Sequence, residues 1–401
     1  MIAMVAQYSI DFKIGDNGRF TDLAECFAAI DDTVLVTSDF SHGEKKKKQP
    51  EKLPDRYAVQ FVETPAYQKN ISLKRIYSCA VFAKNARKYL ETLDDLKLVY
   101  CAVPTPDAGK EVAQFCKKRG IPFVLDIQDL WPDAFYMVLN IPVVSKLLFA
   151  PMKYTADSAY RMTDNLVAVS QTYIDRATKE IGHTAKRELV AFLGNSMKRF
   201  DAAAQAAPKA SGAEPFTVGY IGTLSYSYDL PIVIQAVAHL QKKGKQIRLL
   251  VMGRGPLQEK FEALAKEYAI DAEFTGMLPY EEMVKRLVGC HVAVNPIVKG
   301  SAGSIINKVG DYAAAGLPVV NTQECPEYRE LVEKYRCGIN CPVGQWKPVA
   351  QALEKLLEDE HLRMEMGANA RRLAEDKFDR DRSYLRIADF VREIYEEACR
   401  K

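Results

Sequence analysis

A lysine and an aspartate three residues apart, Lys308 and Asp311, stand in the segment GSIINKVGDYAAAGLPVV, residues 303–320. The pattern predicts a helix over residues 304–315, so both side chains would share one helical face. An ammonium beside the free N–H groups of a helix start is suited to bind phosphate, and a nearby carboxylate can accept hydrogen bonds from sugar hydroxyls. The alternative is a solvated ion pair, which contributes little to stability. The small residues Ala313 to Gly316 favour the ligand-binding interpretation.

Two turns that contain glycine could bring backbone N–H groups next to the same ligand. The first, GYIGTLSYSYDLP, leaves a predicted strand at Gly222 and Thr223. The second, VMGRGPLQEKF, surrounds Arg254 with Gly253 and Gly255. Glycine has no side chain to keep the backbone away from a ligand. An ordinary strand-to-helix turn explains each segment as well. No GxGxxG or Walker A spacing occurs, which weakens a dehydrogenase or ATPase interpretation.

The first half of the chain offers a carboxylate in the segment LDIQDLWPDAF. Asp129 follows a predicted strand, where it could orient or deprotonate an incoming hydroxyl group. Its alternative role is to cap a short helix that Pro132 would begin. A loop over residues 9–25 carries Gly15 and Gly18 and could close over a substrate. A plain flexible loop is the alternative there.

Strands must position these loops, and short apolar runs separated by amphipathic segments continue through most of the chain. Unbroken rather than alternating hydrophobicity predicts strands that are covered on both faces, as in a parallel sheet. Strands that alternate with helices, such as those expected over residues 73–93 and 107–120, are typical of repeated βαβ units. The predicted strands are 3–8, 33–38, 57–63, 96–103, 122–127, 165–170, 189–194, 216–222, 246–253, 271–276, 291–297, 317–322 and 337–341.

The composition changes at residues 201–215, DAAAQAAPKASGAEP, which we interpret as a linker. We therefore predict two doubly wound, Rossmann-like α/β domains, over residues 1–200 and 216–379. An amphipathic helix over residues 380–401 would pack back on the first domain. Open sheets of this kind bind ligands at the carboxyl ends of their strands, so we expect the two domains to face each other across a cleft.

Composition excludes several classes of protein. Of the 401 residues, 48% are hydrophobic and 27% are charged, which is typical of a globular chain and not of a disordered one. The net charge of +3 is spread over both halves, which disfavours a nucleic-acid partner. The nine cysteines form no CxxC pair, so we expect no zinc site and a reducing compartment. Without a signal peptide or a long apolar run, we predict a cytoplasmic protein, at most resting on the inner face of a membrane.

Together these motifs resemble those of retaining glycosyltransferases of the GT-B fold, family 4, and most of all bacterial capsule and O-antigen enzymes that transfer amino sugars. NKVGDYAAAGLPVV resembles the family's donor-site segment SK-x-x-EY-x-A-x-G-x-PVV. GYIGTLSYSYDLPIVIQAVAHL resembles its Gly-loop with the following helix, and VMGRGPLQEKF its Gly-x-Gly-Pro turn. GRFTDLAECF, VLVTSDFSHGEK, DIQDLWPD and NLVAVSQTYI fit the same pattern in the first domain. The resemblance covers nearly the whole chain and is strongest over residues 216–341.

The resemblance implies a UDP-sugar donor held by the second domain, an acceptor held by the first, and no metal cofactor. Lys308 would contact the pyrophosphate, and the candidate catalytic residues are Lys308, Asp311 and Asp129. The candidate donor-binding residues are Gly222, Thr223, Gly253, Arg254, Asn307, Lys308, Asp311 and Tyr312. The candidate acceptor-side residues are Gly15, Gly18 and Asp129.

The chain departs from the family pattern at several positions. The first Glu of the family's paired-glutamate motif falls on Gly303. The Arg and Lys often found after the Gly-loop fall on Thr223 and Tyr228. The family's frequent strand-end His has no counterpart here, because none of the five histidines, at positions 42, 183, 239, 291 and 361, is expected at such a position in the first domain. These departures leave the catalytic base unidentified and place more of the phosphate binding on Lys308, with Arg254 as a second candidate.

The leading hypothesis is sugar transfer to a saccharide acceptor, such as an undecaprenyl-linked saccharide, in the synthesis of cell-surface polysaccharide. The run Lys45–Lys48 and the apolar stretch 135–154 are candidate contacts to lipid, giving a peripheral membrane protein. A solvated loop and ordinary helical core are the respective alternatives. Two other functions stay open: a UDP-sugar 2-epimerase of the same fold, and a nucleotide-sugar-binding subunit without catalysis.

Overall fold

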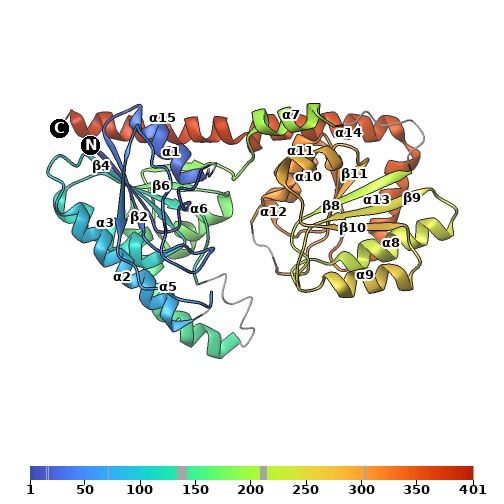
Figure 1. Cartoon of the computed structure of the whole chain (residues 1–401), viewed down its shortest axis with the longest axis horizontal. Coiled ribbons are helices and arrows are strands. Elements are labelled where there is room, and N and C mark those ends of the chain that lie inside the picture. The colour runs from blue at the N-terminus through green and yellow to red at the C-terminus, as the bar shows by residue number, and fades with distance from the viewer. Residues whose placement is uncertain are drawn as a thin grey trace. The chain divides into compact units, whose positions relative to one another are not determined.

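The chain folds into two compact units, as Figure 1 shows in a computed structural model. The first unit comprises Met1–Ala191 together with Tyr384–Lys401, and the second comprises Phe192–Ser383. The structure describes residues 1–14, 16, 18–70, 72–132, 142–207, 215–301 and 304–400. Each unit has its own sheet and its own core, so each is described by itself.

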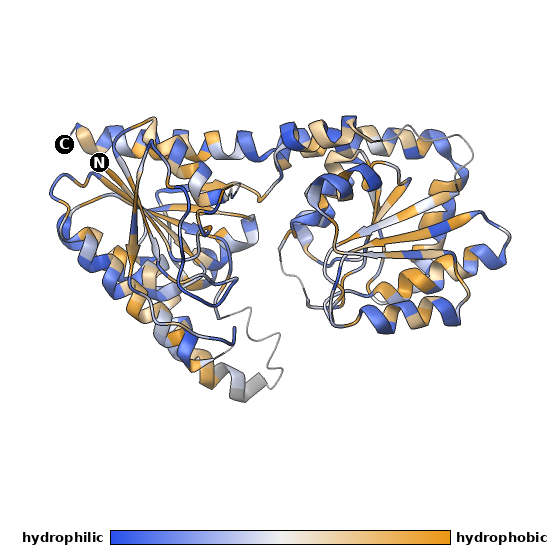
Figure 2. Cartoon of the chain, in the orientation of Figure 1, coloured by the Kyte–Doolittle hydropathy of each residue, from blue (hydrophilic) through white to orange (hydrophobic). Residues whose placement is uncertain are grey.

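The first unit is built on a seven-stranded parallel sheet with the order β3-β2-β1-β4-β5-β6-β7. Every residue of β1, β2, β4, β5 and β6 is buried, because helices cover both faces of the sheet. These strands are drawn mostly in the hydrophobic colour in Figure 2. The strands are β1 (Ile2–Ala6), β2 (Thr33–Ser38), β3 (Ala58–Val62), β4 (Leu98–Val103), β5 (Phe123–Ile127), β6 (Asn165–Ala168) and β7 (Arg187–Val190).

Helices connect the successive strands of the first unit, except that β2 leads to β3 without a helix among the described residues. They are α1 (Arg19–Ala28), α2 (Leu73–Leu90), α3 (Pro106–Arg119), α5 (Pro142–Arg161), α6 (Gln171–Ala177) and the 3-10 turn η1 (Lys179–Ile181). The last helix of the chain, α15 (Arg380–Cys399), begins in the second unit, and its residues from Tyr384 onward belong to the first. Ile387 and Val391 of this helix are fully buried in the core that also contains Met4 and Leu35.

The second unit repeats the plan with a six-stranded parallel sheet in the order β10-β9-β8-β11-β12-β13. Its strands are β8 (Phe216–Ile221), β9 (Ile247–Met252), β10 (Ala272–Gly276), β11 (Val292–Asn295), β12 (Val319–Asn321) and β13 (Gly338–Asn340). Its helices are α7 (Met197–Gln205), α8 (Leu230–Lys242), α9 (Gln258–Glu267), α10 (Tyr280–Leu287), α11 (Lys308–Ala314), α12 (Pro326–Tyr335), α13 (Trp346–Glu358), α14 (Glu360–Leu373) and the π-helical turn η2 (Ala374–Phe378).

The predicted doubly wound class and all thirteen predicted strands are confirmed, with shifts of at most a few residues at the strand ends. The predicted linker is wrong at its start, because residues 201–205 are the second half of α7. Ser196 caps this helix at the N–H of Arg199, and Phe200 and Ala203 are buried, so the segment packs as a helix. Residues 208–214 of the predicted linker lie outside the described residues.

The helix predicted over residues 304–315 is shorter than expected and spans Lys308–Ala314. Its start moves because the carbonyl oxygen of Ser304 accepts a hydrogen bond from Gln323 Nε2 at 2.6 Å, in place of a helical N–H. Gln323 belongs to a group of buried amide side chains at the carboxyl ends of β11 and β12, with Asn295 and Asn321. These amides therefore fix the segment that leads into α11.

Candidate functional site

The loops after β8 and β9 run alongside each other at the carboxyl edge of the second unit and continue the pairing of these strands. Gly222 N–H donates to Met252 O at 3.0 Å, and Leu224 N–H donates to Arg254 O at 3.0 Å. A Cβ atom on Gly253 would lie 1.8 Å from the carbonyl oxygen of Gly222. The backbone at Gly253 is closely approached, as expected for a glycine. The group that approaches it is the backbone of Gly222 in the loop after β8. The side chain of Arg254 has no hydrogen bond or ion pair among the described residues.

Lys308 brings a buried ammonium to this pair of loops. Its Nζ atom lies 4.0 Å from the ring centroid of Tyr220 and 3.9 Å from that of Tyr228. It also lies 3.4 Å from the position that a Cβ atom on Gly222 would take. Lys308 is 8% exposed, and its Nζ has no hydrogen-bond partner in the described part of the chain. Burial lowers the pKa of Lys308 well below its usual value.

The charge of this ammonium is not balanced by a hydrogen bond or an ion pair in the described part of the chain. A buried charge costs free energy unless an opposite charge or several hydrogen bonds balance it. The two tyrosine rings attract the cation through their negative faces, but they cannot neutralise it. An anion at the Gly222 turn would supply the missing partner. The geometry of Lys308 therefore fits an anion-binding role.

A hollow of about 210 Å³ lies beside Lys308. Tyr228 lines this hollow, and its ring also contacts the Lys308 ammonium. The lining of the hollow is uncharged and rich in hydroxyl groups. The lining residues are Thr223, Ser225, Ser227, Tyr228, Ile297, Ser301 and Ile306. Hydroxyl groups donate and accept hydrogen bonds without adding charge, which suits a neutral polar ligand such as a sugar.

Asp311 does not pair with Lys308, contrary to the solvated-pair alternative. Its Oδ1 accepts hydrogen bonds from Asn195 Nδ2 at 3.0 Å and from the Tyr280 hydroxyl at 3.1 Å. Burial raises the pKa of Asp311 to about 6, against the opposing effect of these two hydrogen bonds. Asp311 is thus held by two neighbours as a hydrogen-bond acceptor, with its charge only partly stabilised.

Two other predicted donor contacts are placed differently. Tyr312 is 1% exposed, and its hydroxyl accepts a hydrogen bond from Ile221 N–H at 3.0 Å. It therefore holds the end of β8 and is too buried to contact a ligand directly. Asn307 precedes α11, is exposed, and makes no capping hydrogen bond. Because α11 has only seven residues and starts at Lys308, the helix start predicted to bind phosphate is absent at residue 304.

Asp129 lies in the turn after β5, where both carboxylate oxygens are engaged. Oδ1 accepts from the N–H of Leu130 at 2.9 Å, and Oδ2 accepts from Trp131 Nε1 at 3.2 Å. Burial raises the pKa of Asp129. Both contacts lie within the turn itself, and residues 133–141, which follow the helix start expected at Pro132, lie outside the described residues. Gly18 is the N-cap of α1, and Gly15 lies outside the described residues.

The carboxyl edge of the first unit holds five residues that the sequence analysis did not select: Tyr8, His42, Tyr67, Arg75 and Trp131, here called the Arg75 cluster. The Arg75 guanidinium carbon lies 4.5 Å from the ring centroid of Trp131 and 5.5 Å from that of Tyr8. His42 Nδ1 shares a hydrogen bond with the Tyr67 hydroxyl. Burial, with the nearby charges of Lys45 and Arg75, lowers the pKa of His42 to about 4, so its ring is neutral at pH 7.

His42 also corrects the sequence analysis, which found no strand-end histidine in the first domain. It lies four residues beyond the end of β2, and its ring centroid is 4.9 Å from that of Tyr8. The cluster was missed because its members come from five separate segments. What the five residues share is their place in the sequence. Four of them lie a few residues after the end of β1, β2, β3 or β5, and Arg75 lies in the first turn of α2.

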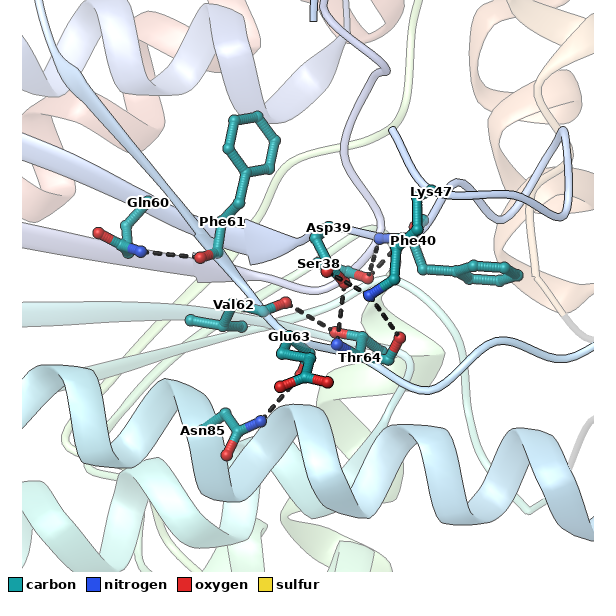
Figure 3. Close-up of polar contacts among 10 residues, drawn as sticks. All are labelled: Ser38, Asp39, Phe40, Lys47, Gln60, Phe61, Val62, Glu63, Thr64 and Asn85. Carbon is teal, nitrogen blue, oxygen red and sulfur yellow. Dashed lines mark hydrogen bonds and ion pairs between the residues drawn. The ribbon is translucent and has the colours of Figure 1, made fainter. Parts of the chain in front are cut away.

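Two of the lysines in the run Lys45–Lys48 are engaged by other groups of the first unit, so the run is not a fully exposed basic patch. Lys47 forms an ion pair with Asp39, as Figure 3 shows. Lys48 Nζ donates to the carbonyl oxygens of Ser9 and Ile10, and burial lowers the pKa of Lys48 to about 8. Residues 135–141 of the predicted apolar stretch lie outside the described residues. Within the described part of the chain, no helix is both long and apolar enough to cross a membrane.

Solved structures show the same fold over the full chain. Sucrose-phosphate synthase from Thermosynechococcus elongatus superimposes with a TM-score of 0.73 at 16% identity, covering 99% of each chain. HepE from Anabaena, solved in complex with UDP, has a TM-score of 0.67 at 16% identity and covers 97% of this chain and 99% of its own. The two doubly wound units therefore form a GT-B fold.

Residues 201–373 match the family model of the glycosyl transferases of group 1. This match lies within the second unit and agrees with the resemblance drawn from the sequence motifs in that half of the chain. Two curated relatives are an alpha-D-kanosaminyltransferase of Streptomyces kanamyceticus, 25% identical over 44% of this chain, and the capsular polysaccharide glycosyltransferase CapM of Staphylococcus aureus, 26% identical over 41%. These matches span 45% and 42% of the relatives' own lengths, less than half of either protein.

Proposed function

We propose that the protein is a retaining glycosyltransferase that moves a sugar from a UDP-sugar to a hydroxyl group of an acceptor. The observation that carries this proposal is the buried Lys308 ammonium, unpartnered among the described residues and facing the Gly222 turn. The diphosphate of the donor would supply its counter-charge. The UDP and UDP-glucose complexes of HepE, which shares the fold, support the choice of donor.

The reaction places negative charge where the lysine lies. The bond between the anomeric carbon and the diphosphate oxygen breaks, and its electron pair leaves with UDP. The acceptor oxygen bonds to the same face of that carbon, and its proton passes to the departing diphosphate oxygen. A fixed cation stabilises the charge that grows on the leaving group. Lys308 would serve this purpose, and Asp311 would accept hydrogen bonds from the ribose hydroxyls.

The sugar and acceptor are assigned from the relatives. Their names point to amino-sugar or hexose transfer and, for CapM, to capsular polysaccharide synthesis. We infer that this chain glycosylates a saccharide or lipid-linked saccharide, such as an undecaprenyl-linked one, held by the first unit at the cytoplasmic side of the membrane. The hydroxyl-lined hollow beside Tyr228 is suited to the donor sugar.

The reaction as proposed uses no metal cofactor, because the lysine takes the charge-stabilising role. We expect transfer activity to survive dialysis against EDTA with less than a twofold loss. A loss restored by Mg²⁺ or Mn²⁺ would instead assign that role to a metal.

Thermal unfolding with UDP, GDP, ADP and a panel of UDP-sugars tests the donor assignment. A ligand at 100 times its dissociation constant stabilises a fold by about 2.7 kcal/mol, which gives a clear shift. We expect a shift with UDP that is lost in Lys308→Ala and kept in Lys266→Ala, where the lysine is exposed on α9. No shift with any nucleotide would rule out the donor site. UDP release that requires an acceptor would separate transfer from an epimerase and from a non-catalytic subunit.

A further inference from the structure

Arg75 brings a positive charge to the Arg75 cluster without an ion-pair partner in the described part of the chain. Its Nε donates to the Tyr8 hydroxyl at 3.2 Å, and its Nη1 donates to Asn70 O at 2.8 Å. Asp129 is near enough for Arg75 to lower its pKa, although burial raises that pKa overall. Both Asp129 oxygens already accept hydrogen bonds from the turn that follows them. The guanidinium is therefore oriented by uncharged partners, Tyr8, Asn70 and Tyr67, and none of them neutralises its charge.

Lys45 is a second cation beside the first. Its Nζ lies 4.8 Å from the Tyr67 ring centroid, and it donates to Asn70 Oδ1. Burial and the charge of Arg75 together lower the pKa of Lys45. Two cations that repel each other at one place are stabilised when an anion binds between them. His42 adds no charge here, because its ring is neutral at pH 7.

The surrounding hydrogen bonds hold these side chains in position before any ligand arrives. Asp39 pairs with Lys47 and accepts from Thr64 N–H at 2.8 Å, which ties the loop of His42 and Lys45 to the end of β3 (Figure 3). Asn85 Nδ2 of α2 donates to Glu63 O at 2.8 Å in the same figure, which fixes the helix that carries Arg75. Such preorganisation lowers the entropy that binding would otherwise cost.

The first turn of α2 also favours a bound anion. Helix starts favour negative charge, yet this turn contains Lys74 and Arg75 and no acidic residue. Two cations at the positive end of an eighteen-residue helix are unfavourable unless an anion is bound nearby. Helix α2 therefore adds to the positive potential that Arg75 and Lys45 create.

We propose that the Arg75 cluster binds a phosphate group of the acceptor, as a monoester or a diphosphate. This inference rests on the proposed transferase function and names the class of acceptor. Two cations match a phosphate better than they match a carboxylate, which carries a single charge, and the planar guanidinium suits phosphate oxygens. The phosphate can belong to a soluble sugar phosphate or to the headgroup of a lipid-linked saccharide.

Binding of inorganic pyrophosphate tests the site separately from transfer. The titration uses Lys308→Ala, which removes the proposed donor phosphate contact, and compares it with Lys308→Ala/Arg75→Gln. We expect about tenfold weaker binding or more in the double variant, because a charged hydrogen bond is lost. Lys308→Ala/Arg119→Gln is the matched control, since Arg119 is exposed at the end of α3 and also stacks on an aromatic ring. Equal affinity in all three proteins would overturn the proposal.

Transfer assays then identify the source of the phosphate. The acceptors are an undecaprenyl diphosphate-linked hexosamine, a hexosamine 1-phosphate and the free hexosamine. Arg75→Gln should raise KM about tenfold or more for phosphorylated acceptors and leave KM for the free sugar unchanged. Use of the lipid-linked acceptor alone assigns the phosphate to lipid, and use of the sugar phosphate assigns it to a soluble acceptor. An equal rise in KM for all three would contradict the proposal.

The two proposals can fail independently. Absence of UDP stabilisation would remove the transferase function, while the pyrophosphate titration would still decide the phosphate site. Conversely, normal UDP stabilisation in Arg75→Gln with unchanged pyrophosphate binding would remove only the phosphate site. Arg75→Lys keeps the charge and loses the planar fork, so it should recover part of the pyrophosphate affinity, which a purely structural role of Arg75 does not predict.

Discussion

Lys308 shows a conflict between stability and binding at a single residue. Its ammonium is buried between Tyr220 and Tyr228 and has no hydrogen-bond partner in the described part of the chain. We expect Lys308→Met, which keeps an unbranched side chain but removes the charged terminal group, to raise the free energy of unfolding of the ligand-free protein by roughly 1–3 kcal/mol. The same variant should lose stabilisation by UDP. Urea unfolding with and without UDP measures both; a variant less stable than the wild type would contradict the unpaired-charge interpretation.

The same lysine sets a pH dependence. Its pKa in the folded protein is below the ordinary 10.5, so between these two values the unfolded chain binds more protons. The stability of the wild type should therefore rise with pH through that window, and the rise should be absent in Lys308→Met. A bound diphosphate would favour the charged form, so UDP binding should take up a proton there. Calorimetry in buffers of different ionisation enthalpy measures the uptake, and none across pH 7–10 would argue against contact with phosphate.

Asp311 should act in the opposite direction. Its pKa is raised from 3.8 to about 6, so the folded protein binds the extra proton between these values. Stability should fall as the pH rises from about 4 to 6, and Asp311→Asn should remove this slope. Because the carboxylate is the better acceptor for ribose hydroxyls, UDP affinity of the wild type should weaken below pH 6. UDP titrations at pH 5 and 7 test this, and an identical change in the variant would exclude Asp311.

At the level of elements, the close contact between the loops after β8 and β9 should tolerate no side chain at Gly253. The added methyl group of Gly253→Ala would stand 1.8 Å from the backbone oxygen of Gly222, so one loop must move. We expect a loss of roughly 1–3 kcal/mol in unfolding free energy and weaker UDP binding, because the Gly222 turn shifts. Gly289→Ala is the control, since its Cβ would lie 3.5 Å from the nearest atom, Arg286 O. Equal stability of the two variants would refute this close contact as the reason for a glycine at position 253.

The elements themselves were predictable, and their side-chain contacts were less so. Unbroken apolar runs predicted all thirteen strands because both faces of each sheet are covered. The spacing of Lys308 and Asp311 pointed to Lys308 as a site residue. Its contacts with the rings of Tyr220 and Tyr228 depend on how residues 219–231 pack, which no local sequence pattern encodes. His42 and Arg75 were missed because they meet only after β2, β3 and α2 have assembled. Contacts between segments distant in the sequence are what sequence patterns do not contain.

At the scale of the whole molecule, each unit carries one proposed anion site at the carboxyl edge of its own sheet, Lys308 in the second unit and the Arg75 cluster in the first. Amide hydrogen exchange can assign ligands to these sites. We expect UDP to protect amides around residues 222–228 and 308–312 most strongly. Pyrophosphate added to Lys308→Ala should instead protect residues 72–79. Protection of residues 72–79 by UDP alone, to the same extent as 308–312, would mean that the two sites do not divide donor from acceptor.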